Sequence, residues 1–284
     1  MPGVLNGHAT GIILKELVRR AILAIRNERQ VFEVRSKAGY SGGMTDVCTS
    51  ADHKAQAVYL KSLRECFPDF GIMAEEDAVA VSPANGCGSY FTVDPLDGTK
   101  AFVRRQSHGA GTMIALVDRG TVISAYVGDI NTQEIYGFRP GSERVHRISE
   151  FEISEQLVPE TRPLTDRYVL LRDPERFYGT ASQRLIPCFK NHEIDGGSIG
   201  TWLARLWKGE VGAAMLPPGF ETPWDSAPVI GISLTLGYSF LKPSPDAKGW
   251  VKYDPVVPQQ VTRRDEDTLI VHQNNLHELP AMMA

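Results

Sequence analysis

Two aspartates three residues apart, Asp94 and Asp97, are the residues whose type and spacing point most directly to chemistry. They follow a β-branched and aromatic run that predicts a buried strand, and the residues after them are compatible with the first turn of a helix. Pro95 fixes its φ and Gly98 permits close backbone approach, so we expect the carboxylates to be held in place. Hard oxygen ligands beside the free N–H groups of a helix N-terminus suit Mg²⁺ and a phosphate ester.

An isolated Asp-x-x-Asp is more typical of a solvated turn than of a metal site. Two other acidic segments shift the interpretation toward the metal site. Glu75 follows a predicted strand at 70–74, and it meets Asp94 only if their two strands are neighbours, which the short connection 81–89 permits. Glu76 is expected to lie behind the site or to face solvent. Asp225 stands at the start of an apolar helix, where a role as N-cap is the alternative.

The three segments Ala-Glu-Glu (74–76), Asp-Pro-Leu-Asp-Gly-Thr (94–99) and Trp-Asp-Ser-Ala (224–227) together resemble the signature of the inositol monophosphatase superfamily of metal-dependent phosphatases. The resemblance covers most of the chain. It implies an α+β fold, a layered α/β/α/β/α sandwich of the inositol monophosphatase and fructose-1,6-bisphosphatase type. We expect an N-terminal half, residues 1–150, whose mixed sheet carries most metal ligands, and a C-terminal α/β half, residues 151–284, that contributes Asp225 and the substrate pocket.

The resemblance also implies a role for each site residue. The expected ligands of two or three Mg²⁺ ions are Glu75, Asp94, the Leu96 carbonyl, Asp97 and Asp225. Asp52 and Thr99 would orient the attacking water, and the N–H groups of Gly98 and Thr99 would hold the phosphate. The substrate pocket would include Gly197, Ser198 and Lys37, the last preceding a glycine-rich loop at 38–43 that in the family helps to admit a further metal ion. From the residues alone, Asp52 would complement a helix dipole, the segment 38–43 would be a flexible linker, and the Gly/Ser turn at 196–200 would be only a loop.

The implied reaction is hydrolysis of a small polyol, sugar or amino-alcohol phosphate by attack of metal-activated water. Inositol phosphatases of the family carry a Glu several residues before the Trp-Asp pair, whereas residues 216–220 here lack one and Glu221 lies too close to Asp225. Lys100 is commoner in the 3′-phosphoadenosine 5′-phosphate and histidinol-phosphate phosphatases, and 111–116 also resembles the histidinol-phosphate branch. These remain alternatives. The non-enzymatic alternative is a regulatory protein that uses the phosphatase fold to bind a partner.

Composition excludes several other classes. The chain has 284 residues, a net charge of −4 and a pI near 6.0, so it has no global basic field for nucleic acid. No apolar run approaches the roughly 20 residues that cross a bilayer, and residues 1–6 do not resemble a signal peptide. The four cysteines are scattered without a C-x-x-C pair, which favours free thiols in a reducing cytoplasm over disulfides or a zinc site. We therefore expect a cytoplasmic protein that acts on a small phosphorylated metabolite, and the resemblance implies a homodimer.

Hydrophobic periodicity predicts the elements that position these residues. We expect a helix at 11–27 capped by Thr10, a strand at 31–36, and a helix that opens at 49–52 and ends before Pro68. Strands at 113–117, 122–128 and 135–138 form a β-meander. In the second half, strands at 168–172, 192–194 and 211–215 alternate with helices at 181–185 and 201–207, which predicts a mixed or parallel sheet.

The remaining stretches have less regular patterns. Residues 141–163 are expected to connect the two halves, and the proline-rich stretch 242–258 to form a surface loop. The helix that opens at Trp224 is expected to point Ile230 and Leu234 inward. A final strand at 269–272 and a helix at 275–283 complete the prediction.

Overall fold

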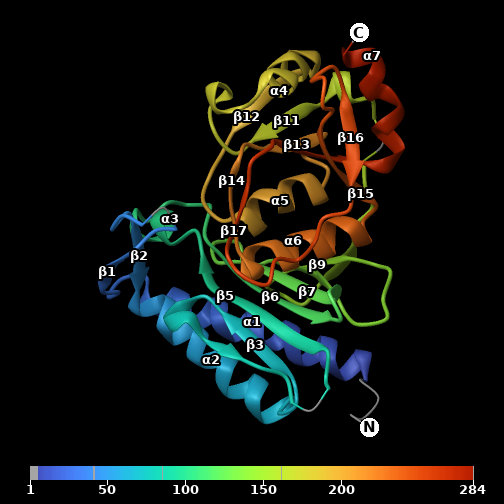
Figure 1. Ribbon diagram of the computed structural model, residues 1–284. Helices are drawn as coiled ribbons and strands as arrows, with labels where there is room; N and C mark the ends of the chain where they lie inside the picture. Colours follow the sequence, from blue (N-terminus) through green and yellow to red (C-terminus); the bar gives the residue numbers. More distant parts are fainter. Residues whose placement is uncertain (1–5, 41, 85, 161, 284) are drawn as a thin grey trace.

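The computed structural model describes residues 6–40, 42–84, 86–160 and 162–283. Helices and sheets stack in five alternating layers, from α1 and α2 near the N-terminus to α4 and α7 near the C-terminus (Figure 1). This confirms the predicted α/β/α/β/α sandwich. Ser41 of the expected glycine-rich loop, and residues 1–5 of the N-terminal segment, lie outside the described residues. None of the helices in the described ranges is both long and apolar enough to cross a membrane.

The first sheet has eight strands and contains the predicted β-meander. In spatial order its strands are β10 (Ser154–Gln156), β9 (His146–Ile148), β8 (Ile135–Phe138), β7 (Thr121–Asp129), β6 (Gly111–Asp118), β5 (Ser89–Asp97), β3 (Gly71–Ala74) and β4 (Ala80–Val81). β3 and β5 are parallel, whereas β5 to β8 pair antiparallel as consecutive neighbours. β5 is buried over nearly its whole length, consistent with its β-branched and aromatic sequence.

Two long helices, α1 (Gly7–Glu28) and α2 (Ser50–Cys66), cover the outer face of this sheet (Figure 1). α1 buries a stripe at helical spacing that includes Leu14, Val18 and Ile25. The expected cap, Thr10, is wrong. The helix begins at Gly7, and its N-cap is Asn6, whose side-chain oxygen accepts from the free N–H groups of His8 and Ala9 at 3.1 Å each.

The second sheet is mixed, as predicted. Its order is β12 (Asn191–Ile194), β11 (Tyr168–Leu171), β13 (Ala213–Leu216), β18 (Thr268–His272), β15 (Tyr238–Pro243) and β16 (Trp250–Tyr253). β11 is parallel to both β12 and β13, and the other pairs are antiparallel. α4 (Thr180–Leu185) and α7 (Leu279–Met283) pack on its outer face through a separate apolar cluster.

Between the sheets lie α5 (Ile199–Trp207) and α6 (Pro223–Thr235), which share one apolar core with both of them (Figure 1). Trp202 and Trp207 are almost completely buried there. Ile230 faces this core as predicted. Leu234 does not, because 45% of its surface is exposed, so the prediction for Leu234 is wrong. The division of the chain at residue 150 stays a prediction.

Several predicted connections contain short strands. The stretch 141–163 includes β9 and β10, which extend the first sheet, and the stretch 242–258 includes β16, which pairs with β15. These strands owe their existence to pairing with distant neighbours, which local composition does not reveal. The expected final helix begins instead as the 3₁₀ segment η5 (Gln273–Glu278) before α7.

Smaller elements complete the chain. The hairpin β1 (Val34–Lys37) and β2 (Asp46–Thr49) flanks the glycine-rich loop, and β14 (Gly219–Glu221) pairs with β17 (Thr262–Arg264). α3 (Thr99–Val103) follows the aspartate hexapeptide. The other short 3₁₀ segments are η1 (Glu76–Ala78), η2 (Leu164–Asp166), η3 (Glu175–Phe177) and η4 (Ile186–Cys188).

Candidate active site

The ends of two neighbouring strands bring the first acids together. β3 and β5 pair in parallel with Ala74 opposite Val93, so Glu75, just after β3, lies beside Asp94 in β5. The Glu75 N–H donates to the Val93 carbonyl at 3.2 Å and continues the pairing by one residue. The two strands are therefore direct neighbours, which confirms the condition on which the predicted meeting of Glu75 and Asp94 depended.

Asp225 approaches the same edge from α6, in the second half of the chain. The N-cap of α6 is Thr222, whose Oγ1 accepts from the Asp225 N–H at 3.1 Å. The alternative role of Asp225 as N-cap is thus filled by Thr222, and the Asp225 carboxylate faces the first sheet instead. Asp94, Asp97 and Asp225 each place a carboxylate oxygen within 4.8 Å of the other two. Acids that lie far apart in the sequence therefore converge.

Burial and mutual repulsion raise the pKa values of these carboxyl groups. The pKa of Glu75 rises to about 8, mainly because of burial, with Lys37 opposing the shift and Asp225 adding to it. The pKa of Asp97 rises to about 7 through burial and then Asp225. The pKa of Asp94 lies well above its ordinary value, through burial and then the charge of Glu75. Its Oδ1 atom is buried and has no hydrogen-bond partner in the described part of the chain. Crowded buried oxygens of this kind fit a divalent cation, whose charge favours their ionised form.

Asp97 is held in place by the start of α5. Its Oδ2 accepts from Ser198 Oγ at 2.5 Å and from the Gly200 N–H at 3.0 Å. Gly98 makes this approach sterically feasible: its φ is +82°, and a Cβ there would lie 2.2 Å from the Gly109 carbonyl oxygen and 2.6 Å from the Ser198 nitrogen. The structure therefore places Ser198 completely buried behind Asp97, while Gly197 lines the cleft.

Asp52, in the first turn of α2, and Thr99, at the start of α3, contact each other. Asp52 Oδ2 accepts from the Thr49 N–H at 2.8 Å and from Thr49 Oγ1 at 2.5 Å, which forms a capping box at the start of α2. Thr99 Oγ1 lies 3.1 Å from Asp52 Oδ1 and 2.9 Å from the Leu96 carbonyl oxygen. Burial raises the pKa of Asp52 to about 6, so the carboxyl is mostly ionised at neutral pH. Asp52 thus lies in the first turn of α2, as the helix-dipole alternative requires, and it also contacts Thr99 as predicted.

Lys37 bridges two consecutive acids at the edge of the site. Its Nζ lies 2.8 Å from Glu75 Oε1 and 2.7 Å from Glu76 Oε1. Glu76 is 4% exposed, so of its two expected positions it lies behind the site and does not face solvent. Its backbone is clamped by the buried Gln56, which donates to the Glu76 carbonyl and accepts from the Glu76 N–H.

The acids open into a cleft of about 360 Å³. Its lining includes the predicted residues Glu75, Asp94, Leu96, Asp97, Gly98, Thr99, Gly197 and Asp225. A second pocket of about 240 Å³ adjoins it and shares Asp225 and Arg172 with it. The walls of this second pocket combine apolar side chains, among them Pro217, Pro218 and Phe220, with charged ones, among them Glu221 and Arg264.

The model of the inositol monophosphatase family matches residues 10–278. The chain belongs to this family. It is 36% identical over 108 residues to the 3′(2′),5′-bisphosphate nucleotidase CysQ of Shigella flexneri, a match that covers 38% of this chain and 41% of that protein. The chain thus matches less than half the length of this curated relative. It is 27% identical over 197 residues to the histidinol-phosphatase of Chlorobaculum parvum, covering 65% of this chain and 68% of that protein.

Solved structures of the inositol monophosphatase family share the fold. One of them, an IMPase/NADP phosphatase complexed with Mg²⁺ and phosphate, superposes with a TM-score of 0.69 at 17% identity and covers 97% of this chain and 94% of the other. At this identity the likeness concerns the fold.

One residue of this inositol monophosphatase family site was missed by the sequence analysis. Arg172 follows β11 and lines both pockets. Its Nη2 donates to the Gly197 carbonyl, its guanidinium lies 5.7 Å from the centre of the Trp202 ring, and its Nη1 is buried without a partner. The available signal was a charged residue that directly ends the apolar run 168–171.

Replacing Ser198 with alanine is expected to weaken Mg²⁺ binding by about 10- to 100-fold, because Asp97 loses the hydroxyl that orients it. Calorimetric titration of the purified variant with Mg²⁺ measures this. The matched control is Ser233→Ala, which removes another fully buried serine, whose Oγ accepts from Trp207 Nε1. Equal Mg²⁺ affinities for Ser198→Ala and wild type would contradict the positioning role of Ser198.

Proposed function

We propose that this protein is a Mg²⁺-dependent phosphomonoesterase that hydrolyses a small phosphate ester by attack of activated water. The observation that carries the proposal is the convergence of Asp225 with Asp94 and Asp97 from the other half of the chain. Membership of the inositol monophosphatase family supports it, and so do relatives named as phosphatases. The solved relative that contains Mg²⁺ and phosphate supports the choice of ion.

The residues of the cleft fit the expected ions. Asp94, Asp97 and Asp225, with Glu75 and the Leu96 carbonyl, would hold two or three Mg²⁺ ions, since hard carboxylate and carbonyl oxygens are the ligands that Mg²⁺ prefers. When bound, such ions lower the pKa of water and offset the negative charge of the reacting phosphate. Asp94 Oδ1 is buried and has no hydrogen-bond partner among the described residues, so a bound cation would supply its counter-charge.

Asp52 and Thr99 would orient the attacking water. The Thr99 hydroxyl has one proton, which it donates in a hydrogen bond to the Asp52 carboxylate at 3.1 Å or to the Leu96 carbonyl at 2.9 Å. The lone pairs of Thr99 Oγ1 then remain to accept a hydrogen bond from water, which aims an oxygen lone pair of that water at phosphorus. The N–H groups of Gly98 and Thr99, at the start of α3, would hold the phosphate oxygens.

The pocket beside the cleft favours a nucleotide over an inositol substrate. A phosphate in the acidic cleft would place its leaving group among Pro217, Pro218 and Phe220, which suit a flat apolar ring better than a ring of hydroxyl groups. Arg172, which lines both the cleft and this pocket, would bind a second anionic group. The favoured candidate substrate is therefore a 3′,5′-bisphosphate nucleotide, and histidinol phosphate is the next alternative.

Release of inorganic phosphate from inositol monophosphate, histidinol phosphate, fructose bisphosphate and 3′-phosphoadenosine 5′-phosphate tests both levels of the proposal. We expect Mg²⁺-dependent turnover, highest with the bisphosphate nucleotide. No turnover of any ester by a protein that still binds Mg²⁺ would favour the partner-binding alternative. The homodimer stays a prediction, which sedimentation equilibrium of the purified chain tests.

Replacing Arg172 with methionine is expected to lower kcat/KM for the bisphosphate nucleotide by about 10- to 100-fold relative to its effect on a monophosphate. The ratio between the two substrates is the informative quantity, because Arg172 also acts on Asp97 and thereby on both reactions. Arg176→Met, which alters a guanidinium 4.7 Å from the centre of the Phe177 ring, is the control. Equal losses with both substrates would contradict recognition of a second phosphate.

A further inference from the structure

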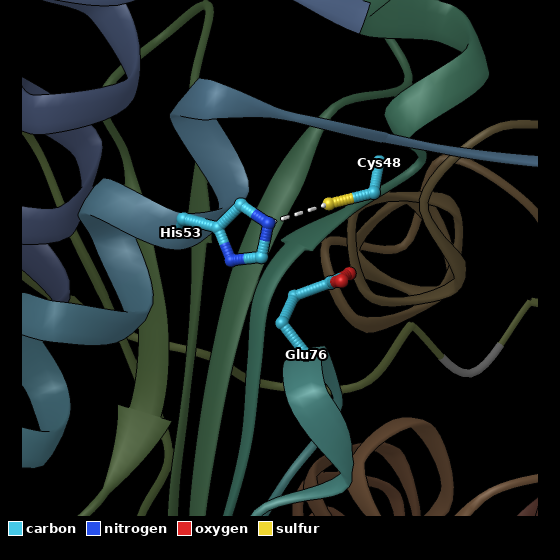
Figure 2. A group of neighbouring side chains, drawn as sticks. All are labelled: Cys48, His53 and Glu76. Atoms are coloured by element: carbon cyan, nitrogen blue, oxygen red, sulfur yellow. Dashed lines mark hydrogen bonds between the residues drawn. The ribbon is translucent and has the colours of Figure 1, made fainter. Parts of the chain in front are cut away.

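A second cluster of ligand-type side chains lies behind the Glu76 side of the active site. Cys48 at the end of β2, His53 in the first turns of α2 and Glu76 at the start of η1 point toward a common space (Figure 2). Their sulfur, nitrogen and oxygen atoms all lie within 4.8 Å of one another. The predicted mechanism uses none of these three groups. A thiol, an imidazole and a carboxylate together are the ligand types of a zinc site.

The separation of the thiol and the imidazole matches this ligand set. Cys48 Sγ lies 3.4 Å from His53 Nε2. Zn–S and Zn–N bonds of about 2.3 and 2.0 Å at a tetrahedral angle separate the two ligand atoms by about 3.5 Å. Both side chains could therefore bind one zinc ion almost where they stand.

The groups behind the cluster also suit a metal site. The second ring nitrogen of His53, Nδ1, lies 3.6 Å from Asp77 Oδ2, the arrangement in which a carboxylate orients a ligating imidazole. Gln56 clamps the backbone of Glu76 through two hydrogen bonds, so this carboxylate comes from a fixed position. Cys48 and Glu76 are buried, whereas about a third of the His53 side chain is exposed and leaves a route for an ion.

A reactive thiol is the competing interpretation of Cys48, and the electrostatics disfavour it. Burial, followed by the neighbouring Glu76 and Asp52 carboxylates, raises the pKa of the Cys48 thiol, with Lys37 only partly opposing the shift. Reactive cysteines need the opposite environment, one that stabilises the thiolate at neutral pH. A divalent cation would supply the missing positive charge.

We propose that Cys48, His53 and Glu76 bind one zinc ion, with water or a further group in the fourth position, at a site separate from the Mg²⁺ cluster. Binding exchanges the thiol proton for the metal, so one proton is released per ion and no electron is transferred. The thiolate and the carboxylate contribute two negative charges that balance the ion. Lys37 Nζ donates to Glu76 Oε1, so the second carboxylate oxygen of Glu76 remains to bind the metal.

Cobalt(II) titration in the presence of excess Mg²⁺ tests the proposal, because a thiolate bound to cobalt gives a near-ultraviolet charge-transfer band that carboxylate ligands do not give. We expect one thiolate–cobalt site per wild-type chain, displaced by one equivalent of Zn²⁺. Cys48→Val should abolish the band, and Cys66→Ser, which changes an exposed free cysteine, should retain it. No band in the wild type, or an unchanged band in Cys48→Val, would overturn the proposal.

A second variant covers the case in which Cys48→Val does not fold. His53 is partly exposed, so His53→Ala is expected to leave folding intact and to weaken cobalt binding at the thiolate site at least about tenfold. Unchanged affinity would equally overturn the site. Neither readout depends on hydrolysis, so failure of the zinc site and failure of the proposed phosphatase activity are distinguishable.

Discussion

Asp94→Asn is expected to abolish Mg²⁺-dependent phosphate release while making the metal-free protein more stable. Activity falls because the substitution removes a charge from the centre of the proposed metal cluster. We expect a loss of at least the 10²- to 10³-fold that follows removal of one stabilising group from an active site. Stability rises because burial, followed by the negative charges of Glu75, Asp225 and Asp97, disfavours the ionised Asp94 carboxylate and raises its pKa. Each unit of such a shift corresponds to about 1.4 kcal/mol.

The two readouts together separate a functional acid from a structural one. If the acid served folding, its replacement would lower the stability of the protein. A higher melting temperature in chelator, together with lost turnover, therefore identifies a functional role. Asp118→Asn is the matched control: Asp118 ends β6, and its Oδ1 accepts from Ser89 Oγ at 2.7 Å. It should keep turnover. Near-full activity of Asp94→Asn with Mg²⁺ would show that the assigned acids do not carry the reaction.

The parts of the site that sequence could predict are those written in contiguous motifs. Residues 94–99 combine a strand end, a turn and a helix start, so their local geometry follows from local sequence, and the structure has β5 followed by α3 there. Glu75 could be placed because its strand and that of Asp94 are close in sequence and pair directly. Asp225 depended on the family resemblance, since nothing local brings α6 to the first sheet.

The parts that were missed depend on contacts between segments with no shared motif. Cys48 and Glu76 lie close together because hydrogen bonds from Gln56 in α2 and Lys37 in β1 hold Glu76 in place. The scattered cysteines of the sequence did not predict a zinc site there. The position of Arg172 in the site follows only from the two pockets that it lines, which local sequence does not predict. β9 and β10 are formed by pairing across the sheet edge, in a stretch whose polar composition is typical of a loop.

The metal-free protein is expected to lose stability as the pH rises from about 5 to 8. The pKa values of Glu75 and Asp97 are about 8 and about 7 in the folded chain, against roughly 4 when unfolded. Between these values the folded state binds more protons than the unfolded state, so the free energy of unfolding falls as the pH rises. A shift of three units corresponds to about 4 kcal/mol for one group, or about 10 °C in melting temperature for a chain of this size.

Mg²⁺ should reverse this loss selectively at high pH. At pH 8 the ions stabilise carboxylates that would otherwise repel one another, so the melting temperature rises by most of what was lost. At pH 5 protons already neutralise the cluster, and the same Mg²⁺ concentration should change little. Thermal melts in chelator, in Mg²⁺ and in NaCl of matched ionic strength measure this. Crowded carboxylates without a cation must take up protons or destabilise the fold. If the protein in chelator were as stable at pH 8 as at pH 5, other groups of the chain would have to compensate these buried charges, and the prediction would be wrong.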